Sequence, residues 1–379
     1  MAVSLEDRLA RELERLREQS RLRSLSSPRG IDFTSNDYLG LARNGELRAL
    51  VIEYLKDGAP LSSSGSRLLR GNHPAHEALE TQCATFFGTE AALYFNSGYD
   101  ANLALLTTLP TRHDTIMLDS LVHASIKEGA HASLAAKRVF DHNSLDSLRS
   151  IRIEAAGNVY VVIESIYSMD GDEAPLREIA DFCSEREYIL IVDEAHATGV
   201  FGRHGRGLID ELGIRSGVAI SMHTMGKALA AAGAIVACSQ TVKDYLVNKA
   251  RPLIYTTALP PAVAFQAMTS VDLMDHMDHE RRRLFQNISI VRDGLTSLRR
   301  WYVVEGRSPI IAVVIGAEHE ALRAAEHIRS AGLDIRAIRP PTVPENSSRL
   351  RIAIHADHSQ TELDRLVNTL YEAEATCAE

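Results

Sequence analysis

The most informative stretch of this chain is Gly217-Val-Ala-Ile-Ser-Met-His-Thr-Met-Gly-Lys-Ala228. Its apolar, β-prone run ends at Met222, four turn-like residues follow, and Lys227 comes directly after them. A second apolar run, 233–238, begins almost at once. This pattern predicts a lysine on a tight loop between two buried strands. Two interpretations stay open from these residues alone: a surface lysine at a turn, or a reactive amine held at the end of a strand.

Composition and motif spacing exclude several classes of protein. The chain has 379 residues, of which 45% are apolar and 24% charged, so it can bury a large core in two or three domains. A net charge of -9 argues against a general nucleic-acid or membrane-surface binder. The charged start and the lack of long apolar runs predict a cytoplasmic protein without a membrane segment. Four scattered cysteines suggest neither disulfides nor zinc. Lys227 does not belong to a P-loop, because Ser221 replaces its first glycine and Ala228 its metal-binding hydroxyl residue.

Alternating helical and apolar segments predict an α/β fold for most of the chain. Seven short apolar strands are expected, with helical segments between most of them, at 91–95, 115–119, 137–140, 158–164, 188–193, 218–222 and 233–238. Such strands are typical of a parallel sheet covered on both faces. Ligands of these sheets bind outside the carboxyl ends of the strands.

Three parts are expected along the chain: an N-terminal helical arm (1–40), a large α/β domain (41–268) and a small C-terminal α+β domain (269–379). The arm should begin with an amphipathic helix rich in Arg and Glu over 5–23. The small domain should hold strands at 301–305, 309–315, 333–338 and 349–355 and helices at 318–331 and 359–374. The serine- and glycine-rich loop 62–74 has no acidic residue and so leaves room for an anion.

Polar residues follow the ends of several expected strands. Asp193 ends one of them, where a carboxylate is costly unless it caps a helix or meets a cation such as a protonated pyridine ring. His196 could bond the phenolic oxygen of a cofactor or simply pack as a helix residue. A metal site of Asp193, His196 and His204 is weak because no ligand spacing recurs. The turn Ser97-Gly-Tyr99 offers backbone N–H groups and a helix dipole to a phosphate, to which Thr224 can add a hydroxyl.

Over nearly its whole length the chain resembles the α-oxoamine synthase family of fold-type I pyridoxal-phosphate enzymes. The motifs that carry the resemblance are Ser35-Asn-Asp-Tyr-Leu-Gly-Leu41, Ser97-Gly-Tyr99, His123-Ala-Ser125, Glu164-Ser-Ile-Tyr-Ser-Met-Asp-Gly-Asp172, Val192-Asp-Glu-Ala-His196, Gly205-Arg-Gly207, Thr224-Met-Gly-Lys227, Tyr255-Thr-Thr257 and Ile338-Arg-Pro-Pro-Thr-Val-Pro344. The resemblance implies a seven-stranded, mostly parallel sheet, pyridoxal 5'-phosphate as cofactor, and a homodimer with its active site at the subunit interface.

The same resemblance assigns residues to the cofactor. Lys227 would be the Schiff-base lysine and Asp193 the partner of the pyridinium nitrogen. The other expected contacts are a ring stack by His123, bonds to the phenolic oxygen from His196 and Ser168, and phosphate contacts from Gly98, Tyr99, Thr224 and, from a neighbouring subunit, Thr256 or Thr257. The catalytic set is Lys227, Asp193, His123 and His196, with no metal.

The implied reaction is a decarboxylative condensation of L-alanine with an acyl-CoA. The segment 338–344 favours the branch that joins L-alanine to pimeloyl-CoA and yields 8-amino-7-oxononanoate, CoA and CO2 in biotin biosynthesis. Substrate binding is assigned to Arg23, Asn36, Arg339 and Thr342, with Arg339 on the amino-acid carboxylate. Two alternatives stay open: a related synthase of the 2-amino-3-ketobutyrate ligase or aminolevulinate synthase type, using glycine or another acyl-CoA, or a non-catalytic cofactor-binding protein. The segment 62–72 replaces a more glycine-rich loop of the family near the acyl channel, which leaves the acyl donor open. Ala197 also departs from the family pattern, since it stands where glycine is usual.

Overall fold

The computed structural model describes residues 4–153 and 157–377, and these form two units. Within the described residues, unit 1 comprises the chain up to Ser35, Met169–Asp172, and the chain from Arg283 onward. Unit 2 comprises Asn36–Ser168 and Glu173–Arg282. Each unit has its own sheet and its own buried core. The three-part division at residues 40 and 268 stays a prediction.

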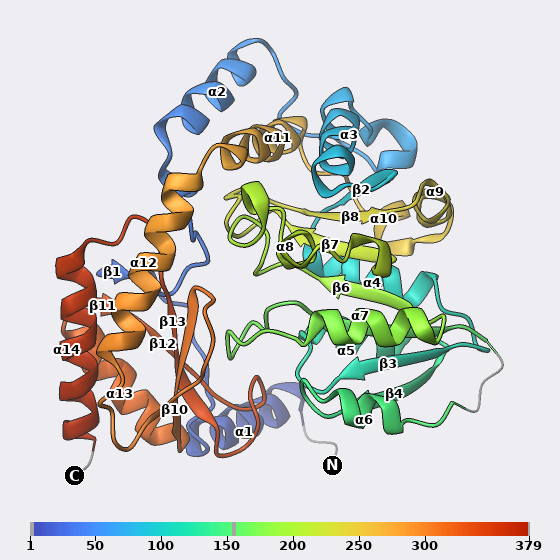
Figure 1. Ribbon diagram of the computed structural model, residues 1–379. Helices are drawn as coiled ribbons and strands as arrows, with labels where there is room; N and C mark the ends of the chain where they lie inside the picture. The colour runs from blue at the N-terminus through green and yellow to red at the C-terminus, as the bar shows by residue number, and fades with distance from the viewer. Residues whose placement is uncertain (1–3, 154–156, 378–379) are drawn as a thin grey trace. The chain divides into compact units, whose positions relative to one another are not determined.

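A seven-stranded sheet with the order β2-β8-β7-β6-β5-β3-β4 forms the centre of unit 2 (Figure 1). Its strands are β2 (Ala91–Phe95), β3 (Thr115–Asp119), β4 (Ala136–Phe140), β5 (Val159–Glu164), β6 (Ile189–Asp193), β7 (Ile220–Thr224) and β8 (Ala234–Cys238). The mostly parallel sheet is confirmed, but β8 runs antiparallel to both of its neighbours. The physical reason is the short link from β7 to β8, since a parallel pair needs a crossover of a dozen residues or more.

Helices cover both faces of this sheet: in Figure 1, α7 lies in front of it and α4 behind it. The helices of unit 2 are α2 (Gly45–Lys56), α3 (Pro74–Phe87), α4 (Gly98–Thr108), α5 (Ala124–Ala132), α6 (Leu145–Ser150), α7 (Leu176–Glu185), α8 (Leu208–Leu212), α9 (Gln240–Lys249), α10 (Arg251–Ile254) and α11 (Pro261–Asp275). Every residue of β2, β3 and β5 is buried, so these strands require cover on both sides. Most of β4 is exposed, as its place at the sheet edge permits.

Unit 1 is built around a four-stranded antiparallel sheet with the order β12-β13-β10-β9. Its elements are β9 (Tyr302–Val303), β10 (Ile310–Gly316), α13 (Glu318–Ser330), β12 (Arg336–Ile338), β13 (Ser348–Ala353) and α14 (Gln360–Thr376). The strand predicted at 333–338 is in fact two strands, because β11 (Leu333–Asp334) pairs with β1 (Ile31–Asp32) in a separate sheet. Helix α12 (Asp278–Gly294) begins in the residues of unit 2 and ends in those of unit 1.

The N-terminal helix is shorter than its sequence pattern predicted. Helix α1 (Leu5–Glu18) ends five residues before the expected position, because Ser20 takes a left-handed φ of 56° that an α-helix cannot continue. The chain beyond it is held within unit 1 by an ion pair of 2.7 Å between Arg21 and Glu318. This pairing is a tertiary contact that the helical pattern does not encode.

Candidate active site

The predicted site residues of unit 2 gather at the carboxyl ends of β5, β6 and β7. Glu164 and Asp193 end adjacent strands and are paired in register, and Thr224 ends the next strand. Because β8 is antiparallel, its amino end lies at the same edge, and the loop 225–233 that leads to it carries Lys227. Three backbone hydrogen bonds, of 2.9, 2.8 and 2.8 Å, close this loop. The predicted tight loop between two strands is confirmed, and its lysine is half-buried.

The amine of Lys227 begins a series of short polar contacts. Its Nζ atom lies 2.8 Å from Nε2 of His196, and Nδ1 of His196 lies 2.7 Å from the hydroxyl of Tyr38. The Tyr38 hydroxyl also donates to Oδ1 of Asn36 at 3.0 Å. Tyr38 and His196 are both buried. Because a neutral imidazole nitrogen accepts a hydrogen bond from an amine, His196 can hold the lysine side chain and exchange a proton with it.

The carboxylate of Asp193 is held from two sides. Backbone N–H of Ala195 donates to Oδ1 at 2.9 Å, and Nδ2 of Asn102 donates to Oδ2 at 2.9 Å. The same Nδ2 lies 3.0 Å from Oγ of Ser125, which lies 2.8 Å from Nδ1 of His123. Residues 195–200 form turns, so the interpretation of Asp193 as the cap of a following helix is wrong. These contacts instead orient a buried carboxylate toward the sheet edge.

Glu164 is a second buried carboxyl group beside Asp193. Backbone N–H groups of His123 and Ser168 donate to it, so it joins the start of α5 to the turn that carries Ser168. Burial, with the neighbouring Asp193 carboxylate, raises the pKa of Glu164 to about 8. At neutral pH Glu164 therefore holds a proton and adds no second negative charge beside Asp193.

The turn from β2 into α4 has the geometry of an anion site. Ser97 caps the helix by accepting from the N–H of Asp100 at 3.0 Å. A Cβ on Gly98 would stand 3.8 Å from Oγ1 of Thr224, so the threonine lies close to the helix start. Tyr99 follows and is exposed. First-turn N–H groups have no partner inside an α-helix, and the helix dipole favours a negative charge there.

Thr256 and Thr257 lie beside the same turn of their own chain. Nδ2 of Asn96 donates to Oγ1 of Thr256 at 3.1 Å and to the backbone oxygen of Thr257 at 2.7 Å. Asn96 directly precedes the Ser97 cap. The assignment of these threonines to the phosphate of a neighbouring subunit stays a prediction.

Three of the four predicted substrate residues lie together in unit 1. Nη2 of Arg23 donates to Oγ1 of Thr342 at 3.0 Å, and the guanidinium of Arg339 donates to the backbone oxygen of Ser20. Burial, with the positive charge of Arg23, lowers the pKa of Arg339. The fourth residue, Asn36, belongs to unit 2. Two guanidinium groups beside a hydroxyl suit carboxylates and phosphates.

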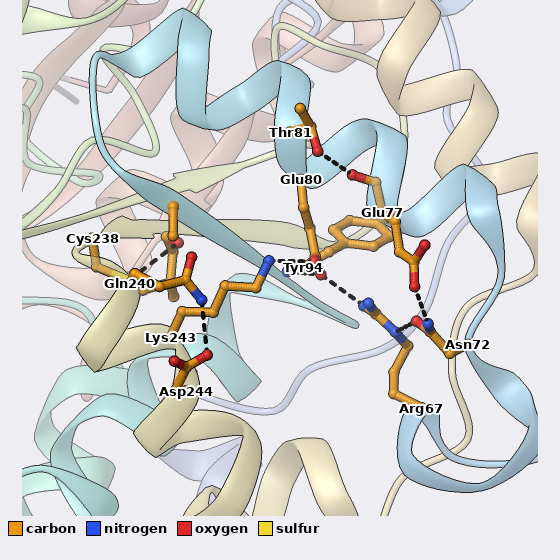
Figure 2. Close-up of polar contacts among 12 residues, drawn as sticks. Arg67, Asn72, Glu77, Glu80, Thr81, Tyr94, Cys238, Gln240, Lys243 and Asp244 are labelled. Atoms are coloured by element: carbon orange, nitrogen blue, oxygen red, sulfur yellow. Dashed lines mark hydrogen bonds and ion pairs between the residues drawn. The ribbon is translucent and has the colours of Figure 1, made fainter.

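Loop 62–74 is held by the buried carboxylate of Glu80 on α3, as Figure 2 shows. Nη1 of Arg67 and Nζ of Lys243 lie 2.9 and 2.8 Å from its two oxygens, and backbone N–H of Tyr94 donates to it at 3.0 Å. Arg67 thus pairs with a carboxylate of its own chain. The lack of acidic residues in the loop left room for an anion, but α3 supplies the negative charge that Arg67 meets.

Two features are absent from residues 4–153 and 157–377. These residues contain no group of three or more His, Cys, Asp or Glu side chains that could hold a metal ion. They also include no helix both long enough and apolar enough to cross a membrane. His204, the third residue of the weak metal interpretation, has its Nδ1 atom 2.9 Å from the backbone oxygen of Asp275.

Four residues that contact the predicted site were not predicted to belong to it: Tyr38, Asn102, Ser125 and Glu164. Three of them stand inside motifs that carried the family resemblance, but pattern alone does not say which side chains in a motif reach the site. Asn102 could have been found from composition. It is an amide within the apolar run of α4, and a buried amide requires a partner.

The donor and acceptor groups of this site fit pyridoxal 5'-phosphate. Asp193 offers a buried carboxylate with spare lone pairs to a protonated ring nitrogen. Lys227 offers an amine to an aldehyde, and the start of α4 offers N–H groups to a phosphate. His196 and Ser168 are buried near the same edge, where the serine hydroxyl can donate to an oxygen substituent on the ring.

Comparison with known proteins agrees with this geometry. Residues 28–370 match the family model described as aminotransferase class I and II. The 8-amino-7-oxononanoate synthase of Chlorobaculum parvum is 40% identical, over 97% of this chain and 99% of its own. A serine palmitoyltransferase from S. paucimobilis, solved with a bound PLP-myriocin aldimine, has a TM-score of 0.89 at 27% identity and covers 98% of each chain. The 8-amino-7-oxononanoate synthase of Francisella tularensis has a TM-score of 0.79 at 29% identity, over 92% of this chain and 98% of its own. The predicted resemblance is confirmed, and the chain belongs to the aminotransferase class I and II family as a pyridoxal-phosphate enzyme of fold type I.

Proposed function

We propose that this chain is an acyltransferase that condenses L-alanine with pimeloyl-CoA to give 8-amino-7-oxononanoate, CoA and CO2, a step of biotin biosynthesis. The relatives named 8-amino-7-oxononanoate synthase support this reaction, since their identity to the chain extends over nearly its whole length. The observation that carries the proposal is that the amine of Lys227 and the carboxylate of Asp193 lie at the same edge of the sheet. An amine held by His196 and a carboxylate held by Asn102 stand there together.

The chemistry divides between the cofactor and the chain. When bound, pyridoxal 5'-phosphate supplies an electron sink for a carbanion at the amino-acid Cα. Asp193 would accept a hydrogen bond from the ring nitrogen and so keep it protonated. Lys227 is the base that takes the Cα proton, and His196, 2.8 Å from its Nζ atom, orients the amine. The N–H groups at Gly98 and Tyr99 would hold the phosphate.

The family resemblance assigns four residues to the substrates. Arg339 takes the carboxylate of L-alanine with two of its guanidinium nitrogens, and the resemblance assigns Asn36 to the amino acid as well. Arg23 and Thr342, bonded to each other, serve the acyl donor. The net reaction forms one C–C bond, between Cα of alanine and the thioester carbonyl carbon. CoA leaves from the thioester and CO2 leaves from the alanine carboxylate.

The active assembly is a two-fold homodimer in this proposal. Its support is the resemblance of the Tyr255-Thr-Thr257 segment to the family and the exposure of the Tyr255 ring next to both threonines. A second copy would cover that ring and receive a hydroxyl at its phosphate. Sedimentation at assay concentration tests this, and a fully active monomer would contradict it.

The activity is tested by measuring CoA release from a matrix of substrates. L-alanine, glycine and L-serine are each combined with pimeloyl-CoA, acetyl-CoA, succinyl-CoA and palmitoyl-CoA. The expected preference is L-alanine with pimeloyl-CoA. Lys227→Ala should release no CoA, whereas Lys249→Ala, at an exposed lysine on α9, should act as wild type.

Other patterns of release would refute the proposal in different ways. Preference for glycine would place the chain in a glycine-using branch, and preference for L-serine with palmitoyl-CoA would place it beside the serine palmitoyltransferases. No release from any pair, with the cofactor bound, would indicate a non-catalytic protein.

A further inference from the structure

Four polar side chains of unit 2 form an unbroken line of hydrogen bonds from the sheet edge to the start of α5. The line runs from Asp193 through Asn102 and Ser125 to His123, with separations of 2.9, 3.0 and 2.8 Å. Asn102 and Ser125 are 3% and 0% exposed, so bulk solvent does not compete for the hydrogen bonds of this line. At one end of the line, Asp193 is assigned to the nitrogen of the cofactor ring. At the other end, His123 is assigned to the face of that ring.

The direction of each hydrogen bond follows from which atoms carry hydrogen. An ionised carboxylate only accepts, so the Asn102 amide must turn Nδ2 toward Asp193. The second hydrogen of Nδ2 points to Oγ of Ser125, which therefore accepts. Ser125 has one hydroxyl hydrogen, and it is left for Nδ1 of His123. Backbone N–H of Ser125 donates to the same Nδ1 at 3.2 Å. Two donors on one ring nitrogen leave no room for a proton on it.

We propose that Asn102 and Ser125 are positioning residues that hold His123 neutral, with its single ring proton on Nε2. The proposal rests on the proposed function only in placing the cofactor ring beside His123 and Asp193. A neutral ring is the form that suits this position. An imidazolium stacked on the cofactor would repel the protonated ring nitrogen that Asp193 is there to stabilise. Through this line, the Asp193 carboxylate determines both the protonation of the cofactor ring nitrogen and the tautomer of His123.

The charges around His123 also influence whether its imidazole takes up a second proton. The surrounding protein removes enough water from the imidazole to lower its pKa; the Asp193 charge opposes this, whereas Lys227 and Lys127 reinforce it. The imidazole also caps the N-terminus of α5, where the helix dipole disfavours a cation. Glu164, which accepts from the N–H of His123, holds a proton at neutral pH and attracts no cation.

The tautomer can be observed directly in the holoenzyme by ¹⁵N NMR with labelled histidine rings. His123→Asn identifies the resonance. The expected wild-type result is an unprotonated Nδ1 and a protonated Nε2 from about pH 8 to about pH 6, where an unperturbed histidine would titrate. A protonated Nδ1 in the wild type would overturn the proposal without reference to any variant.

Variants test whether the line is the cause. Ser125→Ala and Asn102→Ala should let Nδ1 take a proton, so both tautomers appear and His123 titrates at higher pH. Ser133→Ala, at a buried serine just past the other end of α5, should leave the spectrum unchanged. If both site variants fold and keep the wild-type tautomer, the line does not set the state of His123.

Asn102→Asp gives a second readout, through cofactor affinity. Two carboxylates would then face each other and could bond only by sharing a proton. Cofactor affinity should fall at least about tenfold at neutral pH, the scale of one lost charge-assisted bond, and recover as the pH is lowered. Thr107→Ala, exposed on the same helix, is the control. Affinity equal to wild type at every pH would refute the role of Asn102.

These readouts are independent of turnover. Failure to release CoA from any substrate pair, with the predicted tautomer present, would refute the proposed function and support this inference. The reverse pattern, normal CoA release with Nδ1 protonated, would refute only the inference.

Discussion

Gly207→Ala should be one of the most damaging single-methyl additions in unit 2. Gly207 stands before α8 with φ 107° and ψ 179°, a region open almost only to glycine. A Cβ at this position would lie 1.9 Å from Oε2 of Glu194. That carboxyl group is buried directly after Asp193 and accepts from the N–H groups of Leu208 and Ile209 at 3.1 and 3.3 Å. The added methyl group and the carboxyl group cannot both keep their places.

The cost can be assembled from these contacts. Backbone strain in this region is worth about 1–3 kcal/mol. Displacing Glu194 breaks two hydrogen bonds worth about 0.5–1.5 kcal/mol each. The free energy of unfolding should therefore fall by about 2–6 kcal/mol. Gly213→Ala is the matched control: Gly213 also has a positive φ, of 65°, but a Cβ there meets nothing within 4 Å. Its cost should be only the left-handed strain, about 1–2 kcal/mol.

Urea unfolding followed by circular dichroism measures both variants. The double variant Gly207→Ala/Glu194→Ala adds a test of cause, because the overlap disappears with the carboxyl group and the two single costs should not add. If Gly207→Ala costs no more than Gly213→Ala, or if the costs of Gly207→Ala and Glu194→Ala add fully, the overlap with Glu194 is not what requires glycine.

Three further predictions concern the site. Borohydride treatment of the holoenzyme should fix the cofactor on Lys227 and on no other lysine, as peptide mapping will show; an adduct on a different lysine would end the assignment. Glu164→Gln should flatten the pH dependence of stability between about pH 5 and pH 8: the pKa of Glu164 is raised in the folded state, so its stabilising contribution is lost as pH rises through this window. Urea titrations at several pH values measure how the free energy of unfolding changes with pH. Glu178→Gln, on the exposed side of α7, is the control. The same pH dependence in Glu164→Gln as in the wild type would contradict the raised pKa. Arg339→Lys keeps the charge but loses the two-pronged contact, so kcat/KM for L-alanine should fall by about 1–3 kcal/mol in transition-state terms with the cofactor absorbance unchanged; unaltered alanine kinetics would remove Arg339 from the carboxylate site.

Much of the fold and the centre of the site follow from the sequence. Short apolar runs between helical segments specify strands buried on both faces, and seven of them were placed within two residues of their positions in the sheet. Strands of such a sheet share one carboxyl edge, and this rule alone brings Asp193, the turn at Gly98 and Lys227 together. These features depend on burial and local conformation, which residue patterns record directly.

The limits of the sequence appear where distant segments must meet. Nothing local in α4 says that Asn102 will face Asp193, 91 positions further on, and the Tyr38–His196 contact joins residues 158 positions apart. The pairing of Arg67 with Glu80 likewise depends on a contact between separate elements. Pattern therefore determined which residues stand at the sheet edge. Only the folded sheet, with its strand order and the antiparallel β8, decided which side chains touch there, because a hydrogen bond needs atoms about 3 Å apart and only the packing of all elements sets that distance.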